Sequence, residues 1–338
     1  MFKNGCISIL CSLIFLTSCK NHLPVKLIGE AQGTYYMISY YDESNRDFQY
    51  EIDSILDEYD TSVSLWVSES IINRVNNNDS SVVIDNYFRD NFIISKQVSI
   101  ETDGAFDITI EPLVVAWGFG EGGVIDIDTI NINSILTYVG YDKINLINNR
   151  IKKSNPKVQI DFNAIAQGYS VDLILNYLLS KGIENLIVDI GGEVSARGSK
   201  LNGEPWKVGI EKPASKADDI RDLTAIIKLV NKSIATSGNY RKYIEKEGRR
   251  ISHIINPKTG YPSEYNLLSA TVIYDNAAFA DAYATACMVL GLEKSISFVE
   301  AKKGLEAFLI YSTADGQYDS YYSEGFNNLI ISNFQVPE

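Results

Sequence analysis

The sequence holds 338 residues, 45% of them hydrophobic and 22% charged, a composition typical of a folded protein and not of a disordered chain. Its 43 acidic and 30 basic residues give a formal charge of -13. This charge opposes binding to a phosphate backbone, so we expect no nucleic acid among the partners. The length permits one large core or two modest ones. Because no proline-rich linker or internal repeat marks a boundary, we predict a single domain over residues 27–338.

The first residues have the pattern of a secretory signal. Lys3 precedes an apolar run, Ile7–Leu16, which is too short for a permanent membrane helix of about 20 residues. The run ends in Leu-Thr-Ser-Cys at Cys19, which resembles a lipobox, where lipoprotein signal peptidase cuts before a cysteine that is then lipidated. We therefore predict a signal peptide over 1–18, a lipidated cysteine and tether over 19–26, and a lipid anchor in the cell membrane on its extracytoplasmic or periplasmic face. The alternative is a secreted protein whose cysteine carries no lipid.

Cysteine and histidine are scarce in the expected domain. Cys6 and Cys11 leave with the signal peptide and Cys19 is expected to carry lipid, so Cys287 remains and no disulfide is expected within the mature chain. His22 lies in the tether, which leaves His253 as the single imidazole of the domain. The sequence therefore excludes a zinc site built from several histidines.

In chain order, the first half predicts strands and then helices. A strand-like segment covers Leu27–Tyr41 with an interruption at Gly33, and an amphipathic helix follows over Tyr50–Tyr59. The asparagine-rich stretch Asn73–Ser81 is typical of a loop. Helical patterning resumes over Asp85–Gln97, and a segment that contains several glycines follows.

The second half alternates strand and helix signals. A helix over Tyr169–Leu179 is closed by Gly182, and an alanine-rich helix over Ala277–Leu290 is closed by Gly291. Strands separated by both helices and hairpins predict an α+β fold with mixed sheets and packed helices. The expected strands are Val158–Phe162, Leu186–Ile190, Glu193–Arg197, Trp206–Ile210, Ala225–Val230 and Leu267–Tyr274, with a turn at Gly191-Gly192.

The alanine-rich helix carries the first functional signal. Asp281 and Thr285 are four residues apart and therefore share one face of this helix. A carboxylate and a hydroxyl on a largely apolar helix are either a hydrogen-bonded structural pair or two hard oxygen ligands of a cation. Spacing alone leaves both interpretations open.

Three loops carry further candidates. A turn rich in small residues follows Asp161 and opens a helix, whose N-terminus favours phosphate groups. Gly104 and Ala105 leave the main chain accessible beside Asp107, and His253 lies beside a loop punctuated by proline and glycine. Each loop alone is a weak signal, because similar loops occur in proteins without a catalytic role.

Taken together and in this order, these segments resemble the FAD:protein FMN transferase family, the ApbE-type flavin transferases. The resemblance covers nearly the whole expected mature chain. It implies a duplicated T-fold-like architecture and a flavin transferase catalytic domain over 27–338 that attaches FMN to other exported proteins. The most specific stretches are DGAFDITIEPLVVAWGFG from Asp103, GGEVSARG from Gly191, ATSGNYR from Ala235, HIINPKTGYP from His253 and ADAYAT from Ala280.

The resemblance also implies the residues of the site. A magnesium ion is expected at Asp281 and Thr285, with a backbone oxygen of Ala164. Trp66 either stacks on a ring of FAD or is an ordinary core residue. Many relatives place methionine at position 32, lysine or glutamate at position 167 and aspartate at position 256, so this chain departs from them at three positions. The expected FAD contacts are Gln32, Trp66, Ala105, Phe106, Asp107, Asp161, Gln167 and Ile255, and the third departure is Asn256.

The implied reaction is a phosphoryl transfer. A threonine or serine hydroxyl of the acceptor attacks the FMN-side phosphorus of FAD, and AMP leaves. His253 is the candidate base because an imidazole ordinarily titrates near neutral pH, and Asp161 is a competing candidate. The expected acceptors are exported flavin carriers with a D-x-x-S/T-S/G-A-S/T sequence, and an anchor at Cys19 would hold enzyme and acceptor at one membrane surface.

Two rival functions remain open at this point. In a magnesium-dependent FAD pyrophosphatase, water replaces the acceptor hydroxyl and free FMN appears. A non-enzymatic flavin-binding lipoprotein would bind FAD without releasing AMP, although storage gives no reason for a base such as His253. A purely structural lipoprotein would leave five ordered motifs unexplained.

Overall fold

The computed structural model describes residues 23–120, 131–212, 223–239, 243–246, 249–263 and 266–333. The expected signal peptide and Cys19 lie outside the described residues. None of the described helices is long and apolar enough to cross a membrane. The helices are α1 (Gln49–Val63), α2 (Ile71–Asn76), α3 (Asn86–Glu101), α4 (Glu111–Ala116), α5 (Ile132–Leu136), α6 (Ala166–Ser180), α7 (Ala277–Leu290), α8 (Leu292–Ala301) and α9 (Glu324–Asn327), with short 3-10 turns at Ile108–Ile110 and Tyr141–Lys143.

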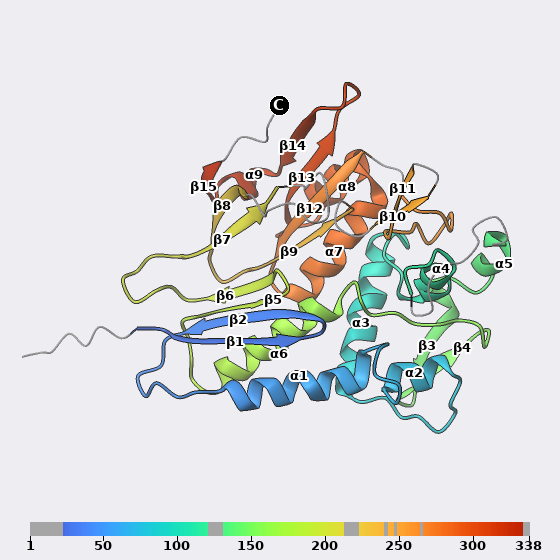
Figure 1. Cartoon of the computed structure of the whole chain (residues 1–338), viewed down its shortest axis with the longest axis horizontal. Coiled ribbons are helices and arrows are strands. Elements are labelled where there is room, and N and C mark those ends of the chain that lie inside the picture. Colours follow the sequence, from blue (N-terminus) through green and yellow to red (C-terminus); the bar gives the residue numbers. More distant parts are fainter. Residues whose placement is uncertain are drawn as a thin grey trace, which may run out of the picture.

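The strands form one large sheet and three small ones (Figure 1). They are β1 (Val25–Ala31), β2 (Thr34–Tyr40), β3 (Ile144–Ile147), β4 (Arg150–Lys153), β5 (Leu186–Ile190), β6 (Glu193–Arg197), β7 (Trp206–Glu211), β8 (Leu223–Leu229), β9 (Ser233–Gly238), β10 (Tyr243–Lys246), β11 (Arg249–Ser252), β12 (Leu267–Tyr274), β13 (Glu306–Ser312), β14 (Tyr318–Tyr322) and β15 (Ile330–Asn333). The large sheet has the order β1-β2-β5-β6-β9-β12-β13-β14, and a smaller one has the order β15-β8-β7. With its packed helices, the fold is α+β, as predicted.

The first two strands form a hairpin that reaches the centre of the molecule. Val25 pairs with Tyr40 at one end and Ala31 with Thr34 at the other. The two turn residues, Gln32 and Gly33, have φ angles of 54° and 71°, the left-handed conformation that two-residue hairpins favour. The hairpin thus begins at Val25, inside the stretch that the sequence assigned to the tether.

Helices α6 and α7 lie against each other and against the large sheet (Figure 1). On its other sides α6 contacts α1, and α7 contacts α3. Nearly every residue of α7 is buried, because a helix of small apolar residues can be enclosed on all sides. Alanines such as Ala280 and Ala284 are fully inaccessible. This pair of central helices is the frame on which the site is built.

The asparagine-rich stretch is only partly a loop. Its first residues, Asn73–Asn76, belong to α2, which begins after Ser70, whose hydroxyl accepts a hydrogen bond from the amide of Asn73. The loop prediction is therefore wrong there, because a serine cap offsets the weak helix propensity of asparagine.

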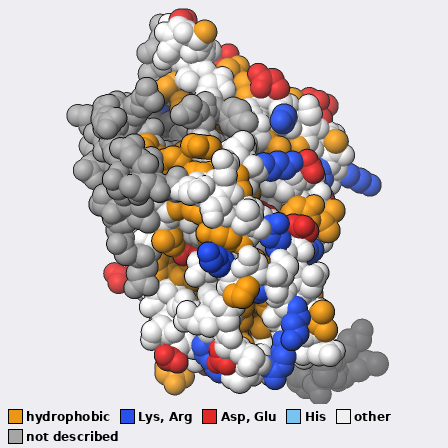
Figure 2. All heavy atoms as spheres, turned by 90° about the vertical axis from the view of Figure 1, so that its right-hand side faces the viewer, with side chains coloured by type: hydrophobic (Ala, Val, Ile, Leu, Met, Phe, Trp, Pro, Cys, Tyr) orange, Lys and Arg blue, Asp and Glu red, His pale blue; other side chains and the backbone are white. Residues whose placement is uncertain are grey.

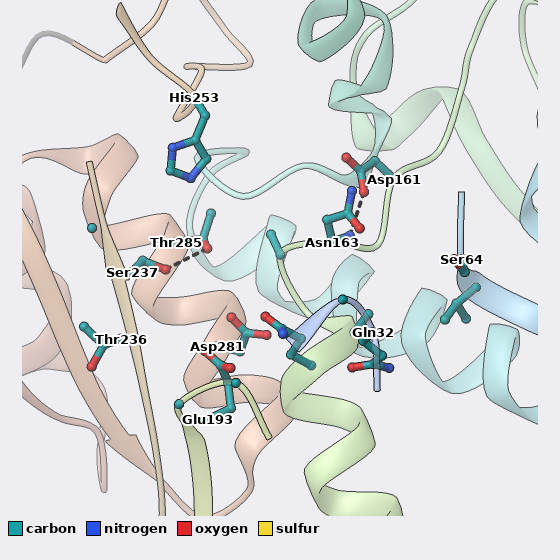
Figure 3. Close-up of a pocket in the computed structure, with 18 of the residues that line it drawn as sticks. Gln32, Ser64, Asp161, Asn163, Glu193, Thr236, Ser237, His253, Asp281 and Thr285 are labelled. Atoms are coloured by element: carbon teal, nitrogen blue, oxygen red, sulfur yellow. Dashed lines mark hydrogen bonds between the residues drawn. The ribbon is translucent and has the colours of Figure 1, made fainter. Parts of the chain in front are cut away.

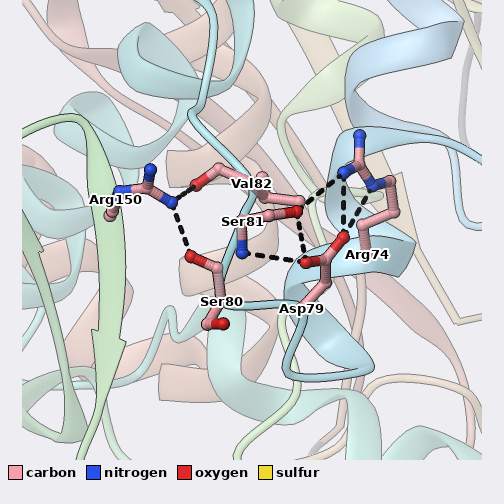
Figure 4. Close-up of polar contacts among 6 residues, drawn as sticks. All are labelled: Arg74, Asp79, Ser80, Ser81, Val82 and Arg150. Atoms are coloured by element: carbon pink, nitrogen blue, oxygen red, sulfur yellow. Dashed lines mark hydrogen bonds and ion pairs between the residues drawn. The ribbon is translucent and has the colours of Figure 1, made fainter.

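The loop that follows α2 is held by two arginines (Figure 4). Arg74 forms an ion pair of 2.8 Å with Asp79. The guanidinium of Arg150, on β4, donates to the carbonyl oxygens of Ser80 and Val82 at 2.6 and 2.8 Å. These contacts fix the loop against the β3–β4 hairpin.

The strand predicted at Val158–Phe162 does not form. The side chain of Asn76 donates to the carbonyl of Ile160 at 2.9 Å and accepts from its amide at 2.7 Å. The amide of Asp161 donates to the carbonyl oxygen of Ile108 at 2.8 Å. The apolar residues Val158, Ile160 and Phe162 alternate in sequence and are buried, but Asp161 between them is buried too. An asparagine and a loop take the place of a neighbouring strand.

Most other predicted elements are confirmed with small shifts in their ends. The bounds of β5, β6, β12 and α7 are those expected, α3 begins just after Asp85, and α6 begins three residues early. Gly182 and Gly291 have φ angles of 82° and 77°, the conformation that ends helices. Cys287 is free and buried on α7.

Charged side chains of both signs are interspersed on the face of the molecule shown in Figure 2. Lysine and arginine side chains lie beside aspartate and glutamate there, with hydrophobic side chains between them. On this face, the excess of acidic residues therefore does not produce a uniformly negative surface.

Candidate active site

A cavity of about 1480 Å³ opens beside the β1–β2 turn, the N-terminus of α6 and the buried face of α7. It is larger than the roughly 300–1,000 Å³ of ordinary small-molecule pockets, which leaves room for a dinucleotide. Twelve residues that the sequence assigned to flavin, metal or catalysis all line it. They are Gln32, Trp66, Ala105, Phe106, Asp107, Asp161, Ala164, Gln167, His253, Ile255, Asp281 and Thr285.

Asp281 and Thr285 face the cavity from α7, and each bonds to a different partner. The carboxylate of Asp281 accepts a hydrogen bond of 3.1 Å from the amide of Gly168, in the first turn of α6. The hydroxyl of Thr285 lies 3.1 Å from that of Ser237, at the end of β9 (Figure 3). The structural alternative, a hydrogen bond between Asp281 and Thr285, is therefore wrong.

The electrostatics of this corner favour a cation. Asp281 is only 7% exposed, and burial raises the pKa of its carboxyl to about 7. A second buried carboxylate, Glu193 at the start of β6, lies beside it in Figure 3. Within the described residues no three His, Cys, Asp or Glu side chains form a metal cluster. Hard oxygens of Asp281, Thr285 and the main chain at Ala164 nevertheless suit magnesium.

Gln32 and Trp66 lie at the hairpin side of the cavity. The side-chain oxygen of Gln32 accepts a hydrogen bond of 3.2 Å from Ser170. Burial, partly offset by the nearby Gln32, raises the pKa of the Asp60 carboxyl. Trp66 is 69% exposed. The alternative that Trp66 is a core residue is therefore wrong, and its indole is accessible to a ligand.

The loop with Ala105, Phe106 and Asp107 is fixed by its own carboxylate. Asp107 accepts hydrogen bonds from the amide and hydroxyl of Thr109, at 2.8 and 2.7 Å, and from the amide of Tyr141 at 2.6 Å. Burial raises the pKa of Asp107. Since both carboxylate oxygens of Asp107 accept hydrogen bonds from the protein, this side chain stabilises the conformation of the loop.

His253 and Asp161 reach the cavity from different loops (Figure 3). The ring of His253 packs edge-on against Phe119, with centroids 6.2 Å apart. Asp161 accepts a hydrogen bond of 2.6 Å from the amide of Asn163. Asn256 instead accepts from the amides of Lys258 and Thr259, at 2.9 and 3.3 Å. An amide at position 256 therefore suffices to hold its own loop.

Sequence reasoning missed several polar residues that line the same cavity, among them Glu111, Asp189, Glu193 and Ser237. Three of these four stand inside the stretches that carry the family resemblance, but no spacing pattern assigned them a role. Glu111 and Glu193 are both buried. A buried carboxylate is unusual enough to mark a functional position.

Comparisons with known proteins identify the family of this chain. The sequence matches the ApbE family over residues 32–309. The FAD:protein FMN transferase of Vibrio cholerae serotype O1 is 34% identical over 326 residues, which are 94% of this chain and 96% of that protein. The FAD:protein FMN transferase of Escherichia coli K12 is 31% identical over 346 residues, 96% of this chain and 97% of that protein.

Solved structures extend the likeness to the fold. Flavin transferase ApbE from Vibrio cholerae has a TM-score of 0.80 at 33% identity, over 90% of this chain and 99% of that one. The apo form of Pseudomonas stutzeri flavinyl transferase ApbE has a TM-score of 0.79 at 31% identity, over 92% and 98%. On this sequence match and fold, the chain belongs to the ApbE family and is a transferase.

Proposed function

We propose that this protein is a Mg²⁺-dependent FAD:protein FMN transferase. It attaches FMN through a phosphoester to a threonine or serine of exported flavoprotein subunits and releases AMP. The observation that carries the proposal is the single cavity lined by all twelve residues expected for flavin, metal and catalysis. Relatives that bear this enzyme's name align over nearly the whole chain.

The cavity offers FAD both stacking and main-chain contacts. Trp66 is the exposed aromatic side chain that stacks on one of its rings. Because the Asp107 carboxylate is occupied within its loop, residues 105–107 contact FAD through the main chain. Gln32, Gln167 and Ile255 complete the binding walls.

The phosphate end of FAD belongs near the N-terminus of α6. Asp281 and Thr285, with a main-chain oxygen of Ala164, would hold Mg²⁺ there. When bound, the ion supplies positive charge that stabilises the phosphate oxygens of the transition state. The amide of Gly168 keeps the Asp281 carboxylate directed at this corner.

A base must take the proton of the acceptor hydroxyl, and the chain offers two candidates. His253 and Asp161 both line the cavity. His253→Ala and Asp161→Asn separate them, because loss of the base lowers kcat by about 10²–10⁴-fold, whereas loss of a binding residue acts mainly on KM.

We also propose that Cys19 carries lipid and holds the enzyme at the extracytoplasmic or periplasmic surface of the membrane. Support comes from the Leu-Thr-Ser-Cys sequence alone. Cys19→Ser is expected to release the protein from membranes, as measured by fractionation and by the mass of the N-terminal peptide. An unlipidated cysteine in membrane-bound protein would contradict this proposal.

The deciding experiment mixes the chain lacking residues 1–19 with FAD, Mg²⁺ and an acceptor domain that carries the D-x-x-S/T-S/G-A-S/T sequence. We expect the acceptor to gain the mass of FMN and AMP to appear, and EDTA or Asp281→Ala to abolish both. Asp57→Asn is the matched control, because Asp57 is an exposed carboxylate outside the cavity.

Two other results would overturn the proposal. AMP and free FMN with an unmodified acceptor, repeated over several acceptors, would indicate a pyrophosphatase. Bound but intact FAD under all conditions would indicate a flavin-binding protein.

A further inference from the structure

Glu111 is a buried carboxylic acid in the wall of the flavin cavity. It is the first residue of α4, follows the turn Ile108–Ile110, and is 8% exposed. Glutamate is almost never buried in this way unless it is paired. No motif or spacing pattern in the sequence assigned Glu111 a role in the site.

The partner of Glu111 is Asp161. The main-chain amide of Asp161 donates to the carbonyl of Ile108 at 2.8 Å, so the turn that precedes Glu111 and the segment that carries Asp161 are joined. The two side chains lie within reach of each other in the cavity wall, since the interaction with Asp161 raises the pKa of Glu111. Asp161 accepts from the amide of Asn163 at 2.6 Å (Figure 3), which orients its carboxylate.

A hydrogen bond between the two carboxyl groups exists only if one of them carries a proton. Two ionised carboxylates have acceptors and no donor, and they repel each other strongly when buried. Within the described residues, no amide, hydroxyl or amine donates to the Oε2 atom of Glu111. A hydrogen bond between the two side chains therefore needs a proton on one of the carboxyl groups.

The proton resides on Glu111. Burial, and next the negative charge of Asp161, raise the pKa of Glu111 to about 8. Among the described titratable groups, Asp161 is the one whose charge acts on Glu111, while Asp107 and His253 line the same cavity. At neutral pH Glu111 is thus mainly the neutral acid, as in other carboxyl pairs that share a proton.

We propose that Glu111 is a positioning residue which, as a neutral carboxylic acid, donates a hydrogen bond to Asp161 and holds that carboxylate in the flavin cavity with a single charge on the pair. This inference rests on the proposed function for its ligand, FAD. A second charge on the pair would repel the pyrophosphate of FAD in a cavity that already contains Asp281 and Glu193. Neutral Glu111 removes that repulsion and fixes the orientation of Asp161.

Glu111→Gln separates this role from simple packing, because glutamine has the same shape and donates a hydrogen bond but does not ionise. We measure the dissociation constant of FAD from pH 6.5 to 9.5 by its fluorescence, with the chain lacking residues 1–19. In the wild type, affinity should fall about tenfold as pH rises past 8, because the second charge forms there. In Glu111→Gln, affinity should match the wild type below pH 7.5 and show no further decline between pH 8 and 9.5.

Two further variants complete the test. Glu111→Leu removes the donor and is expected to weaken FAD binding about tenfold at every pH. Glu51→Gln, an exposed glutamate on α1 outside the cavity, should keep the wild-type pH profile. If Glu111→Leu does not fold, the pH dependence of FAD affinity in Glu111→Gln still tests the role of Glu111.

The outcomes are distinct. An identical alkaline decline in wild type and Glu111→Gln, or no decline in the wild type, would overturn the role of Glu111. Absence of FAD binding at every pH in the wild type would overturn the proposed function and with it this inference.

Discussion

The main-chain amide of Gly168 donates a hydrogen bond of 3.1 Å to the carboxylate of Asp281, and thereby joins the start of α6 to the middle of α7. A β-carbon at position 168 would lie 2.4 Å from the carbonyl oxygen of Ala277 and 2.8 Å from the β-carbon of Asp281. Both distances are far inside van der Waals contact. Only glycine lets the two helices approach closely enough to form this corner of the cavity.

Gly168→Ala is therefore expected to destabilise the protein by about 1–3 kcal/mol, because the added methyl group pushes α6 away from α7. The free energy of unfolding in urea measures this. Asn176→Ala, an exposed change on the same helix, should stay within about 0.5 kcal/mol of the wild type. Equal free energies of unfolding for Gly168→Ala and wild type would show that α6 and α7 move apart at no cost in stability, which would contradict this prediction.

Asp172 links the same two helices and predicts a dependence of stability on pH. Its carboxylate accepts hydrogen bonds of 2.9 Å from the amides of Ala277 and Ala278, at the start of α7. Burial outweighs these bonds and raises the pKa of Asp172 to about 6, against about 3.9 in an unfolded chain. Between these values the folded chain binds a proton that the unfolded chain has lost, so this contribution to stability decreases as pH rises.

Asp172→Asn removes this titration and keeps one acceptor for the two amides. The advantage of wild type over the variant should be about 1 kcal/mol larger at pH 5 than at pH 7. Urea unfolding of both proteins at the two pH values measures it. An advantage that is constant, or that grows toward pH 7, would contradict the assignment to Asp172.

Much of the fold was readable from local signals. The helix over Ala277–Leu290 and the paired strands around Gly191-Gly192 have the predicted bounds, because glycines mark their ends. The segment Val158–Phe162 does not form the predicted strand. Its apolar residues alternate in sequence, but its main chain bonds to Asn76, 84 residues away from Ile160. No local pattern reports such a contact.

The residues of the site were predicted mainly through the family resemblance, and their contacts only in part. Spacing brought Asp281 and Thr285 to one face, but it did not reveal that each bonds elsewhere, to Gly168 and Ser237. The pairing of Glu111 with Asp161 joins residues 50 positions apart. The two residues meet because the fold buries Glu111, and neither composition nor hydrophobic periodicity predicts the burial of a single glutamate.

Cys287 should be inert in the folded protein. It is fully buried on α7, and burial raises the pKa of its thiol to about 12, so almost no thiolate is present near neutral pH. In the chain lacking residues 1–19, a thiol reagent should label one site in urea and none in buffer. Rapid labelling of the native protein would show that α7 opens locally.

Trp66 should bind FAD without supporting the fold. Its side chain is 69% exposed and lines the cavity, so Trp66→Ala removes stacking area but no core contact. We expect FAD affinity to fall about 5- to 30-fold, which corresponds to about 1–2 kcal/mol, and the unfolding midpoint to stay unchanged. Titration of FAD by calorimetry, together with thermal unfolding, measures both quantities.

Tyr50→Ala is the matched control, because Tyr50 is 81% exposed on α1 and lies outside the cavity. It should leave FAD affinity as in the wild type. Trp66→Phe should recover part of the affinity, since a smaller ring still stacks. Equal affinity in all three variants would mean that the exposed indole has no part in flavin binding, whereas a lower unfolding midpoint in Trp66→Ala alone would assign it to the structure of the 64–67 loop.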